Sequence, residues 1–168
     1  FTVLSNIAVA ATTGMLAVRL ERHSTLFRTI RLDGLVAIAV TGVVFHLTLA
    51  QLQELTGWNA FADGILHTAS PILAVLGWLA FGPRGQVSRR IVLLAAIAPV
   101  CWLVYALVRG ANVQDRDGND FYPYPFMNVP EHGYPVVLAN CAIVAVLFVA
   151  ICAAALWGDR RLPGVRSA

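Results

Sequence analysis

Five long apolar runs, separated by shorter polar segments, dominate the pattern of hydrophobic and polar positions along the chain. A helix that crosses a bilayer needs about 20 mostly apolar residues. The runs cover approximately residues 1–18, 32–52, 63–81, 91–108 and 135–157. This pattern predicts an all-α fold, a polytopic transmembrane helix bundle forming a single domain over 1–168. The first run opens the sequence directly, so we expect one further N-terminal span, six in total.

Proline and acidic positions add local expectations to this pattern. Pro71 and Pro99 lie inside predicted spans, where a missing N–H and a crowded preceding turn should kink each helix. The only long connection is 110–134, and the X-Pro steps in its run Tyr122–Phe126 favour an extended or turned conformation. We place Asp33 in the first turn of its helix, where a negative charge suits the helix dipole.

The composition excludes an ordinary soluble domain. The chain is 58% hydrophobic and 12% charged, whereas soluble domains carry roughly 25% charged residues. Its net charge of +3 lacks the clustering that a phosphate-binding surface needs, so no nucleic-acid partner is expected. The three cysteines all lie in apolar runs, as small buried hydrophobic residues commonly do.

The arginines are distributed unevenly among the polar segments. Ten of the twelve lie in three segments: Arg19, Arg22, Arg28 and Arg31; Arg84, Arg89 and Arg90; Arg160, Arg161 and Arg166. Because cytoplasmic loops carry an excess of basic residues, we expect these segments and the C-terminus on the cytoplasmic side of a bacterial cell membrane. The same assignment places the following near the outer surface: Thr2, His46, His67, the run Tyr122–Phe126 and Asn140.

Polar side chains gather in the outer halves of the spans, which predicts a polar pocket near the outer end of the bundle. A pore would need polar lining through its full depth. Thr2, Ser5 and Asn6 share one helix face at positions i, i+3 and i+4. The alternative for Ser5 and Asn6 is a structural role, because such side chains commonly bridge membrane helices.

The histidines are the main candidates for chemistry. Asp63 stands four residues before His67, so its carboxylate could fix the tautomer of the ring, as beside a catalytic base. The alternative is an interfacial histidine next to a helix N-cap. His46 is predicted to be buried about two turns below the outer end of its span, as either a functional or a structural residue. No third ligand or haem-attachment motif accompanies the histidines, so no metal or other cofactor is expected.

Four motifs in order resemble the bacterial Pr6Pr membrane proteins, distant relatives of the animal androgen-induced, FAR-17a-like family. They are Phe1–Asn6 (FTVLSN), Thr41–His46 (TGVVFH), Ala62–Thr68 (ADGILHT) with Pro71 after it, and Tyr122–Phe126 (YPYPF). The resemblance covers nearly the whole chain and implies six spans. The animal relatives are intramembrane threonine hydrolases of hydroxy-fatty-acid esters. Their nucleophile and base fall on Thr2 and His67 by local motif. A position after Pro71 that is often acidic in relatives is Gly77 here.

These observations lead to the hypothesis of a hydrolase of lipid esters near the outer leaflet, acting on membrane lipids or fatty-acyl esters. Thr2 would attack the ester carbonyl and His67 would accept its proton, oriented by Asp63. Stabilisation of the oxyanion is left open among Asn6, Asn140, Tyr122 and Tyr124.

Two rival functions remain: a non-catalytic protein that binds or transports an amphiphile, and a structural membrane protein whose polar residues only join helices. The role of His46, the substrate and the oligomeric state stay open. The distance between the Thr2 hydroxyl and the His67 ring separates the alternatives, because a base must lie within hydrogen-bond reach.

Overall fold

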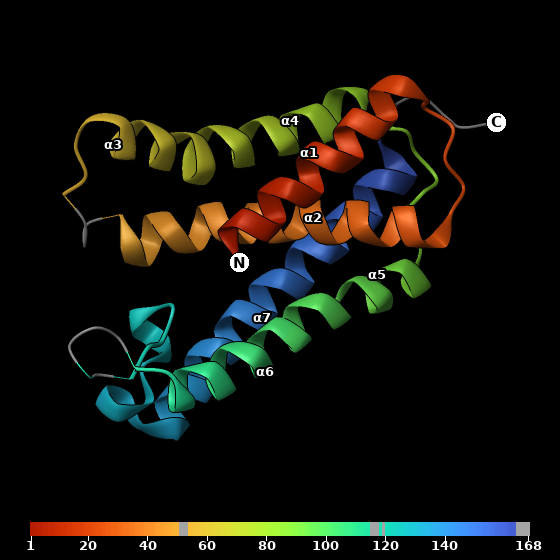
Figure 1. The fold of residues 1–168 in the computed structure, drawn as a ribbon. Helices are drawn as coiled ribbons and strands as arrows, with labels where there is room; N and C mark the ends of the chain where they lie inside the picture. Colours follow the sequence, from red (N-terminus) through yellow and green to blue (C-terminus); the bar gives the residue numbers. More distant parts are fainter. Residues whose placement is uncertain (51–53, 115–117, 119, 164–168) are drawn as a thin grey trace.

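The computed structural model describes residues 1–50, 54–114, 118 and 120–163 of the chain, and these residues form helices and connecting turns (Figure 1). In order, the elements are α1 (Thr2–Val18), α2 (Thr25–Val44), the π-helical turn η1 (Phe45–Leu49), α3 (Gly57–Gly64), the π-helical turn η2 (Ile65–Ala69), α4 (Ser70–Phe81), α5 (Arg89–Ala95), α6 (Ile97–Asn112), the 3₁₀ turn η3 (Pro125–Met127) and α7 (Val129–Arg161). The prediction of an all-α helix bundle is confirmed.

Among the described residues, four helical stretches are long and apolar enough to cross a membrane: Thr25–Leu49, Gly57–Phe81, Arg89–Asn112 and Val129–Arg161, the last of which is kinked at Gly133. The apolar helix α1 is shorter, at 17 residues. Large apolar side chains such as Leu73, Leu93 and Val146 cover the outside of these helices and are exposed. An exposed apolar surface of this extent is typical of a bundle solvated by lipid. The chain is therefore a multi-pass membrane protein.

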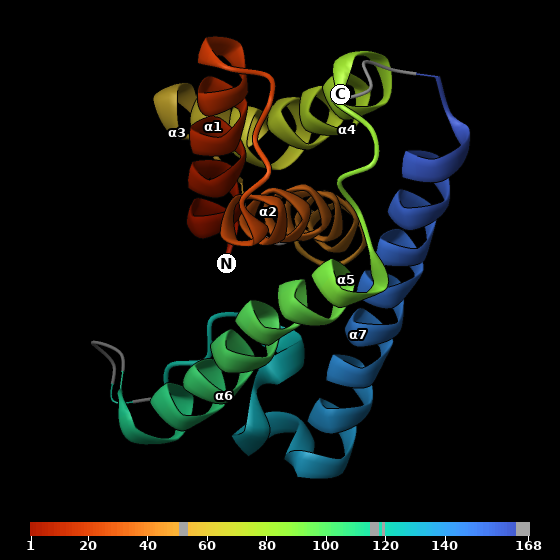
Figure 2. The ribbon, with the colours of Figure 1, turned by 90° about the vertical axis from the view of Figure 1, so that its right-hand side faces the viewer.

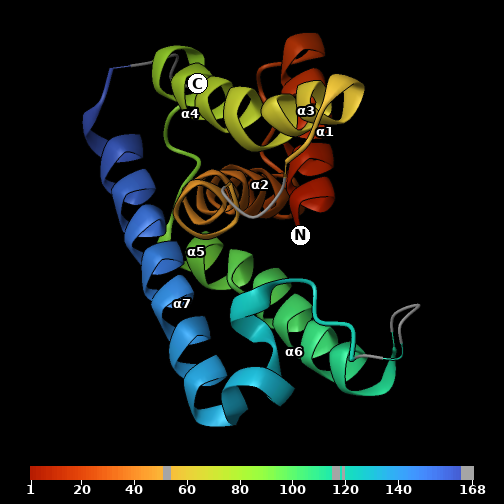
Figure 3. The same cartoon turned by 90° about the vertical axis from the view of Figure 1, so that its left-hand side faces the viewer.

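Helix α2 runs through the centre of the bundle. It contacts α1, α4, α5 and α7, and Figures 2 and 3 show it end-on with these helices around it. Its side chains Val36 and Ile38 are fully buried. Gly34 lets α1 approach closely, because a Cβ there would lie 3.0 Å from the Cβ of Ala8. The central position of α2 means that residues on its different faces contact four other helices of the bundle.

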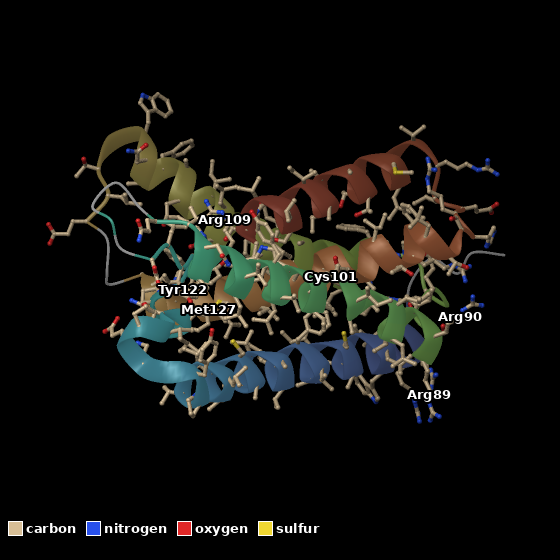
Figure 4. The ribbon with its side chains drawn as sticks, turned by 60° about the horizontal axis from the view of Figure 1, so that its bottom comes forward. Arg89, Arg90, Cys101, Arg109, Tyr122 and Met127 are labelled. Carbon is tan, nitrogen blue, oxygen red and sulfur yellow. The ribbon has the colours of Figure 1, made fainter. Side chains whose placement is uncertain are left out.

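The arginine-rich connections gather at one end of the bundle. Figure 4 places Arg89 and Arg90 at the end opposite to Arg109 and Tyr122. Within that end, the buried Asp159 carboxylate accepts hydrogen bonds from the backbone N–H groups of Gln86 and Val87, at 3.4 and 3.0 Å. These bonds fasten the connection between α4 and α5 to the end of α7.

Helices α2, α3 and α7 begin earlier than the sequence pattern predicts; α7 begins at Val129, within the connection predicted over 110–134, and is kinked at Gly133. Ser24 caps α2, its hydroxyl accepting from the backbone N–H of Phe27, so Asp33 lies in the third turn and our interpretation of it as a dipole partner is wrong. Helix α3 begins at Gly57 after Thr56. Asp63 therefore lies inside a helix, which removes the alternative of an N-cap aspartate. His67 lies ten residues, or about 15 Å, along the helix from its start.

The two prolines predicted to kink their helices, Pro71 and Pro99, both distort them in a way that proline chemistry explains. A proline ring clashes with the carbonyl four residues earlier and offers no N–H to it. Four residues before Pro99 is Ala95, where α5 ends and the chain turns into α6. Four residues before Pro71 is His67, which lies in η2. The predicted kinks thus take two forms, a break between helices and a π-helical turn.

Residues 120–128, between α6 and α7, fold back against both helices, which diverge at this end (Figure 2). Met127 is buried in a cluster with Ala106 of α6 and Val137 of α7. The Tyr122 ring packs directly against Gly110, a position where any Cβ would collide with it. The turned conformation agrees with the expectation from the X-Pro steps. This segment thereby closes one end of the space between α2, α6 and α7.

Candidate active site

The Thr2 hydroxyl and the His67 ring are in contact, although they come from different helices and the two residues are 65 positions apart in sequence. Thr2 lies in the first turn of α1 and His67 in η2. The Thr2 Oγ1 and His67 Nε2 atoms are 3.2 Å apart and form a hydrogen bond. This distance is within the reach that a general base needs. The sequence-based candidates for nucleophile and base are therefore adjacent.

Asp63 contacts the other nitrogen of the same ring. Its Oδ1 atom lies 2.9 Å from His67 Nδ1, across one helical turn, and both side chains are about four-fifths covered. The ring N–H does not point directly at that oxygen, so the pair is close without a well-aligned hydrogen bond. The carboxylate favours the tautomer with its proton on Nδ1, which leaves Nε2 free to accept the proton of Thr2.

The π-helical turn η2 explains how His67 reaches Thr2. In this turn the N–H of Ser70 bonds to the carbonyl of Ile65, five residues earlier. The next N–H in that pattern would come from Pro71, which has none. The Leu66 carbonyl is consequently left without a helical partner, and the Asn6 side chain of α1 donates to it at 3.3 Å.

Asn6 and Ser5 also hold the backbone of Thr2. The Ser5 hydroxyl and the Asn6 amide both donate to the Thr2 carbonyl, at 2.9 and 3.0 Å. Asn6 therefore bridges Thr2 and η2 with its single NH₂ group. The alternative proposed from the sequence, that Ser5 and Asn6 are structural bridging residues, describes what both side chains do here.

The second π-helical turn lies beside the first. In η1 the Thr48 hydroxyl donates to the Val44 carbonyl at 2.7 Å, while the N–H of Ala50 bonds to Phe45 five residues earlier. The Phe45 ring of η1 stacks on the His67 ring, with centroids 4.1 Å apart and planes 14° apart. Single π-helical turns occur frequently at functional sites, and here two adjacent turns position one histidine ring.

A cavity of about 250 Å³ opens directly from this pair. Thr2, Thr41, His67 and Tyr124 supply its polar groups, and the remaining lining is apolar, from α2, α6 and α7. On α7 the lining runs from Cys141 to Val149, about 12 Å of helix. The prediction of a polar pocket is therefore wrong: the polar groups line one region of an otherwise apolar chamber.

The cavity also has a lateral opening. Three of its lining residues, Val100 of α6 and Ala145 and Val149 of α7, are exposed on the surface of the bundle. They lie on the two helices that diverge in Figure 2. The opening between these helices lies in the apolar part of the bundle, which lipid acyl chains surround in a membrane.

Tyr124 reaches the same hydroxyl from the segment between α6 and α7. Its side chain lines the cavity together with Thr2 and His67, and its phenol lies close enough to Thr2 to influence the phenol pKa. The ring stacks on Phe126, with centroids 5.3 Å apart, and lies 5.8 Å from the Trp102 ring. Burial raises the pKa of the Tyr124 phenol above its ordinary value, and the neighbouring Thr2 side chain offsets this only in part.

The other predicted site residues lie outside the cavity. The Asn140 amide donates to the Phe126 carbonyl at 3.1 Å, which positions the segment that bears Tyr124. Tyr122 packs on Gly110. His46 was expected to be buried but is exposed, because its position along the chain, in η1, fixes its depth and not its face. Its Nε2 atom pairs with the Thr68 hydroxyl at 3.1 Å.

Sequence reasoning missed three features: the π-helical turns, the role of Phe45 and the apolar chamber. Only Pro71 gave a signal, since a proline predicts some distortion of the preceding turn. In the described part of the chain, His, Cys, Asp and Glu side chains form no group of three that could hold a metal ion.

Comparisons of the chain with models of protein families, with characterised proteins and with solved structures find no match. Function is therefore inferred from the geometry of Thr2, His67, Asp63 and the cavity.

Proposed function

We propose that this membrane protein is an intramembrane threonine hydrolase of lipid esters, of the hydroxy-fatty-acid ester type. The observation that carries the proposal is the contact of 3.2 Å between Thr2 Oγ1 and His67 Nε2 at the polar end of the cavity. A threonine hydroxyl is a weak nucleophile on its own and needs an adjacent base. The motifs shared with Pr6Pr proteins point to the same two residues, and membership of that family is part of the proposal.

The reaction follows from the positions of the three side chains. Thr2 Oγ1 bonds to the acyl carbon while His67 Nε2 takes the hydroxyl proton. When the bond from the acyl carbon to the alcohol oxygen breaks, His67 returns the proton to the leaving alcohol. Water then attacks the acyl-threonine, losing a proton to His67, and Thr2 recovers that proton as the free acid leaves. Asp63 stabilises the positively charged ring between these steps.

The cavity supports a substrate with a long acyl chain. An apolar chain would occupy the lining of α2, α6 and α7, with its ester carbonyl beside Thr2. Such a substrate would enter from the membrane between α6 and α7, where Val100, Ala145 and Val149 are exposed. With the arginine-rich end on the cytoplasmic side, the reactive pair lies in the half of the bundle toward the outer leaflet.

The test is covalent labelling of the protein in detergent micelles with a fluorophosphonate probe, which reacts with activated hydroxyl nucleophiles. We expect the wild type to be labelled and Thr2→Ala and His67→Ala to be unlabelled. Thr13→Ala, an exposed threonine of the same helix, and His132→Ala, an exposed histidine in the first turn of α7, are matched controls that should label normally. Mass spectrometry of the adduct should locate it on Thr2.

An unlabelled wild type, or an adduct that persists in Thr2→Ala, would contradict the proposal. The apolar cavity itself favours one alternative, a protein that binds or transports an amphiphile without turning it over. In that case a fluorescent fatty acid should bind with the same affinity to the wild type and to Thr2→Ala, while neither is labelled by the probe.

A further inference from the structure

An ester hydrolase needs a hydrogen-bond donor for the negative oxygen that forms in the tetrahedral intermediate. Four side chains are candidates by type and by position in the sequence: Asn6, Asn140, Tyr122 and Tyr124. The hydrogen bonds of the structure separate these candidates. A donor must have a free proton and must lie beside the attacking oxygen.

Three of the four fail on these grounds. Both N–H groups of Asn6 are used, on the carbonyls of Thr2 and Leu66. The amide of Asn140 donates to the Phe126 carbonyl and does not line the cavity. Tyr122 packs against Gly110, also away from the cavity lining.

Tyr124 meets both conditions. Its side chain lines the cavity together with Thr2, and since the proton of Thr2 is directed to His67, the phenol O–H remains available to donate to a bound ester. An oxygen that develops on the carbon bonded to Thr2 Oγ1 lies two bonds from that atom, inside the cavity that Tyr124 lines. A rotation of the phenol hydroxyl would direct its proton to that oxygen.

The phenol is also held rigidly and in the right protonation state. Stacking on Phe126 and contact with Trp102 fix the ring plane, and the bond from Asn140 fixes the backbone of Phe126. Burial raises the pKa of Tyr124 above its ordinary value of 10.0, so the group keeps its proton across the working range of an ester hydrolase. A preorganised donor in a water-poor cavity stabilises charge more strongly than one in water.

We propose that Tyr124 is a catalytic residue that donates its phenol proton as a hydrogen bond to the oxyanion formed when Thr2 attacks an ester. This inference rests on the proposed threonine hydrolase function. It makes the segment 120–128 a part of the active site that closes over the cavity, although no charged catalytic group lies in it.

The experiment compares ester hydrolysis by the wild type, Tyr124→Phe and Tyr122→Phe in lipid nanodiscs, with para-nitrophenyl octanoate as the probe. Removal of one oxyanion donor lowers kcat by about 10²–10³-fold. We expect that loss for Tyr124→Phe with KM nearly unchanged, because the phenyl ring still packs on Phe126 and Trp102. Tyr122→Phe, which changes the same group outside the cavity, should keep the wild-type kcat.

The possible outcomes distinguish a failure of the role proposed for Tyr124 from a failure of the proposed hydrolase function. If the wild type hydrolyses the ester and Tyr124→Phe retains its kcat, Tyr124 is not the donor while the hydrolase proposal stands. A rise in KM alone would assign Tyr124 to substrate packing and overturn its catalytic role. If the wild type shows neither hydrolysis nor labelling on Thr2, the hydrolase proposal fails and the catalytic assignment of Tyr124 fails with it.

Discussion

The rings of Phe45 and His67 stack face to face, 4.1 Å between centroids and 14° between planes. Each belongs to a π-helical turn, η1 for Phe45 and η2 for His67. The stack fixes the plane of the histidine ring, and the Nε2 atom consequently points at Thr2. A displacement of about 1 Å in such a pair can cost about 10²-fold in rate.

Phe45→Leu should therefore slow labelling of Thr2 by roughly 10- to 100-fold, because an aliphatic side chain leaves the histidine ring free to rotate. Phe45→Tyr keeps the stacked ring and should restore most of the rate. The measurement is the rate of fluorophosphonate labelling. Phe61→Leu, an exposed phenylalanine of α3, serves as the matched control. Equal labelling rates for Phe45→Leu and the wild type would show that the ring stack does not position His67.

A second prediction concerns the contact between α2 and the turn that bears His67. A Cβ added at Gly42 would lie 3.0 Å from the Cβ of Pro71 and 3.5 Å from the His67 carbonyl. Gly42→Ala should push the two helices apart, at a cost of about 1–3 kcal/mol for overpacking, and should lower the labelling rate by moving His67 from Thr2.

Gly77→Ala provides the control for that experiment. Gly77 lies on α4 with nothing within 4 Å of an added Cβ, so alanine should be neutral or slightly stabilising in the helix. In detergent, Gly42→Ala should unfold at a lower temperature than Gly77→Ala, and its labelling rate should be lower. A Gly42→Ala protein with unchanged unfolding temperature would show that the helix contact is looser than the distances indicate.

The sequence predicts the helices well because lipid imposes a simple condition on them. Every backbone group in a span must be satisfied internally, so an apolar run of sufficient length forms a helix. The alternation of arginine-rich connections also orients the runs, and the two ends of the bundle segregate as that pattern indicates (Figure 4). From these two facts alone Thr2 and His67 are expected on the same side of the fold.

The details of the site depend on tertiary contacts that the pattern does not contain. Pro71 predicts a distorted helix, but a kink and a π-helical turn satisfy that signal equally well. The π-helical turn is favoured because the Asn6 amide donates a hydrogen bond to the Leu66 carbonyl, which has no helical partner. Phe45 resembles any aromatic residue in an apolar run. The sequence predicts how far along its helical stretch His46 lies but not that its side chain is exposed, because hydrophobic periodicity is weak in a uniformly apolar helix.

A third prediction tests the positioning role of Asp63. Asp63→Asn removes the negative charge 2.9 Å from His67 Nδ1 while keeping the size of the side chain. The amide can favour the wrong tautomer and no longer stabilises the charged ring, so kcat for ester hydrolysis should fall by roughly 10²–10⁴-fold. Glu54→Gln, a carboxylate that precedes α3, is the control. An active Asp63→Asn enzyme would leave His67 acting alone.

The last prediction concerns the length of the acyl chain. Ala96 lines the cavity at the break between α5 and α6, and its helical backbone angles, φ −69° and ψ −14°, accommodate leucine. Ala96→Leu should fill the end of the chamber without disturbing Thr2 or His67. Turnover of para-nitrophenyl palmitate should then fall by about 10-fold or more relative to the acetate ester, since even one methylene changes discrimination by 10–200-fold.

Ala98→Leu, two residues later on the exposed face of α6, adds the same side chain outside the cavity and should leave the ratio of the two turnover rates unchanged. The ratio is the informative quantity, because a general loss of folded protein lowers both rates equally. If Ala96→Leu lowers both in proportion, or leaves the palmitate rate intact, the acyl chain lies outside the cavity. The substrate would then approach the reactive pair along the surface between α1 and η2.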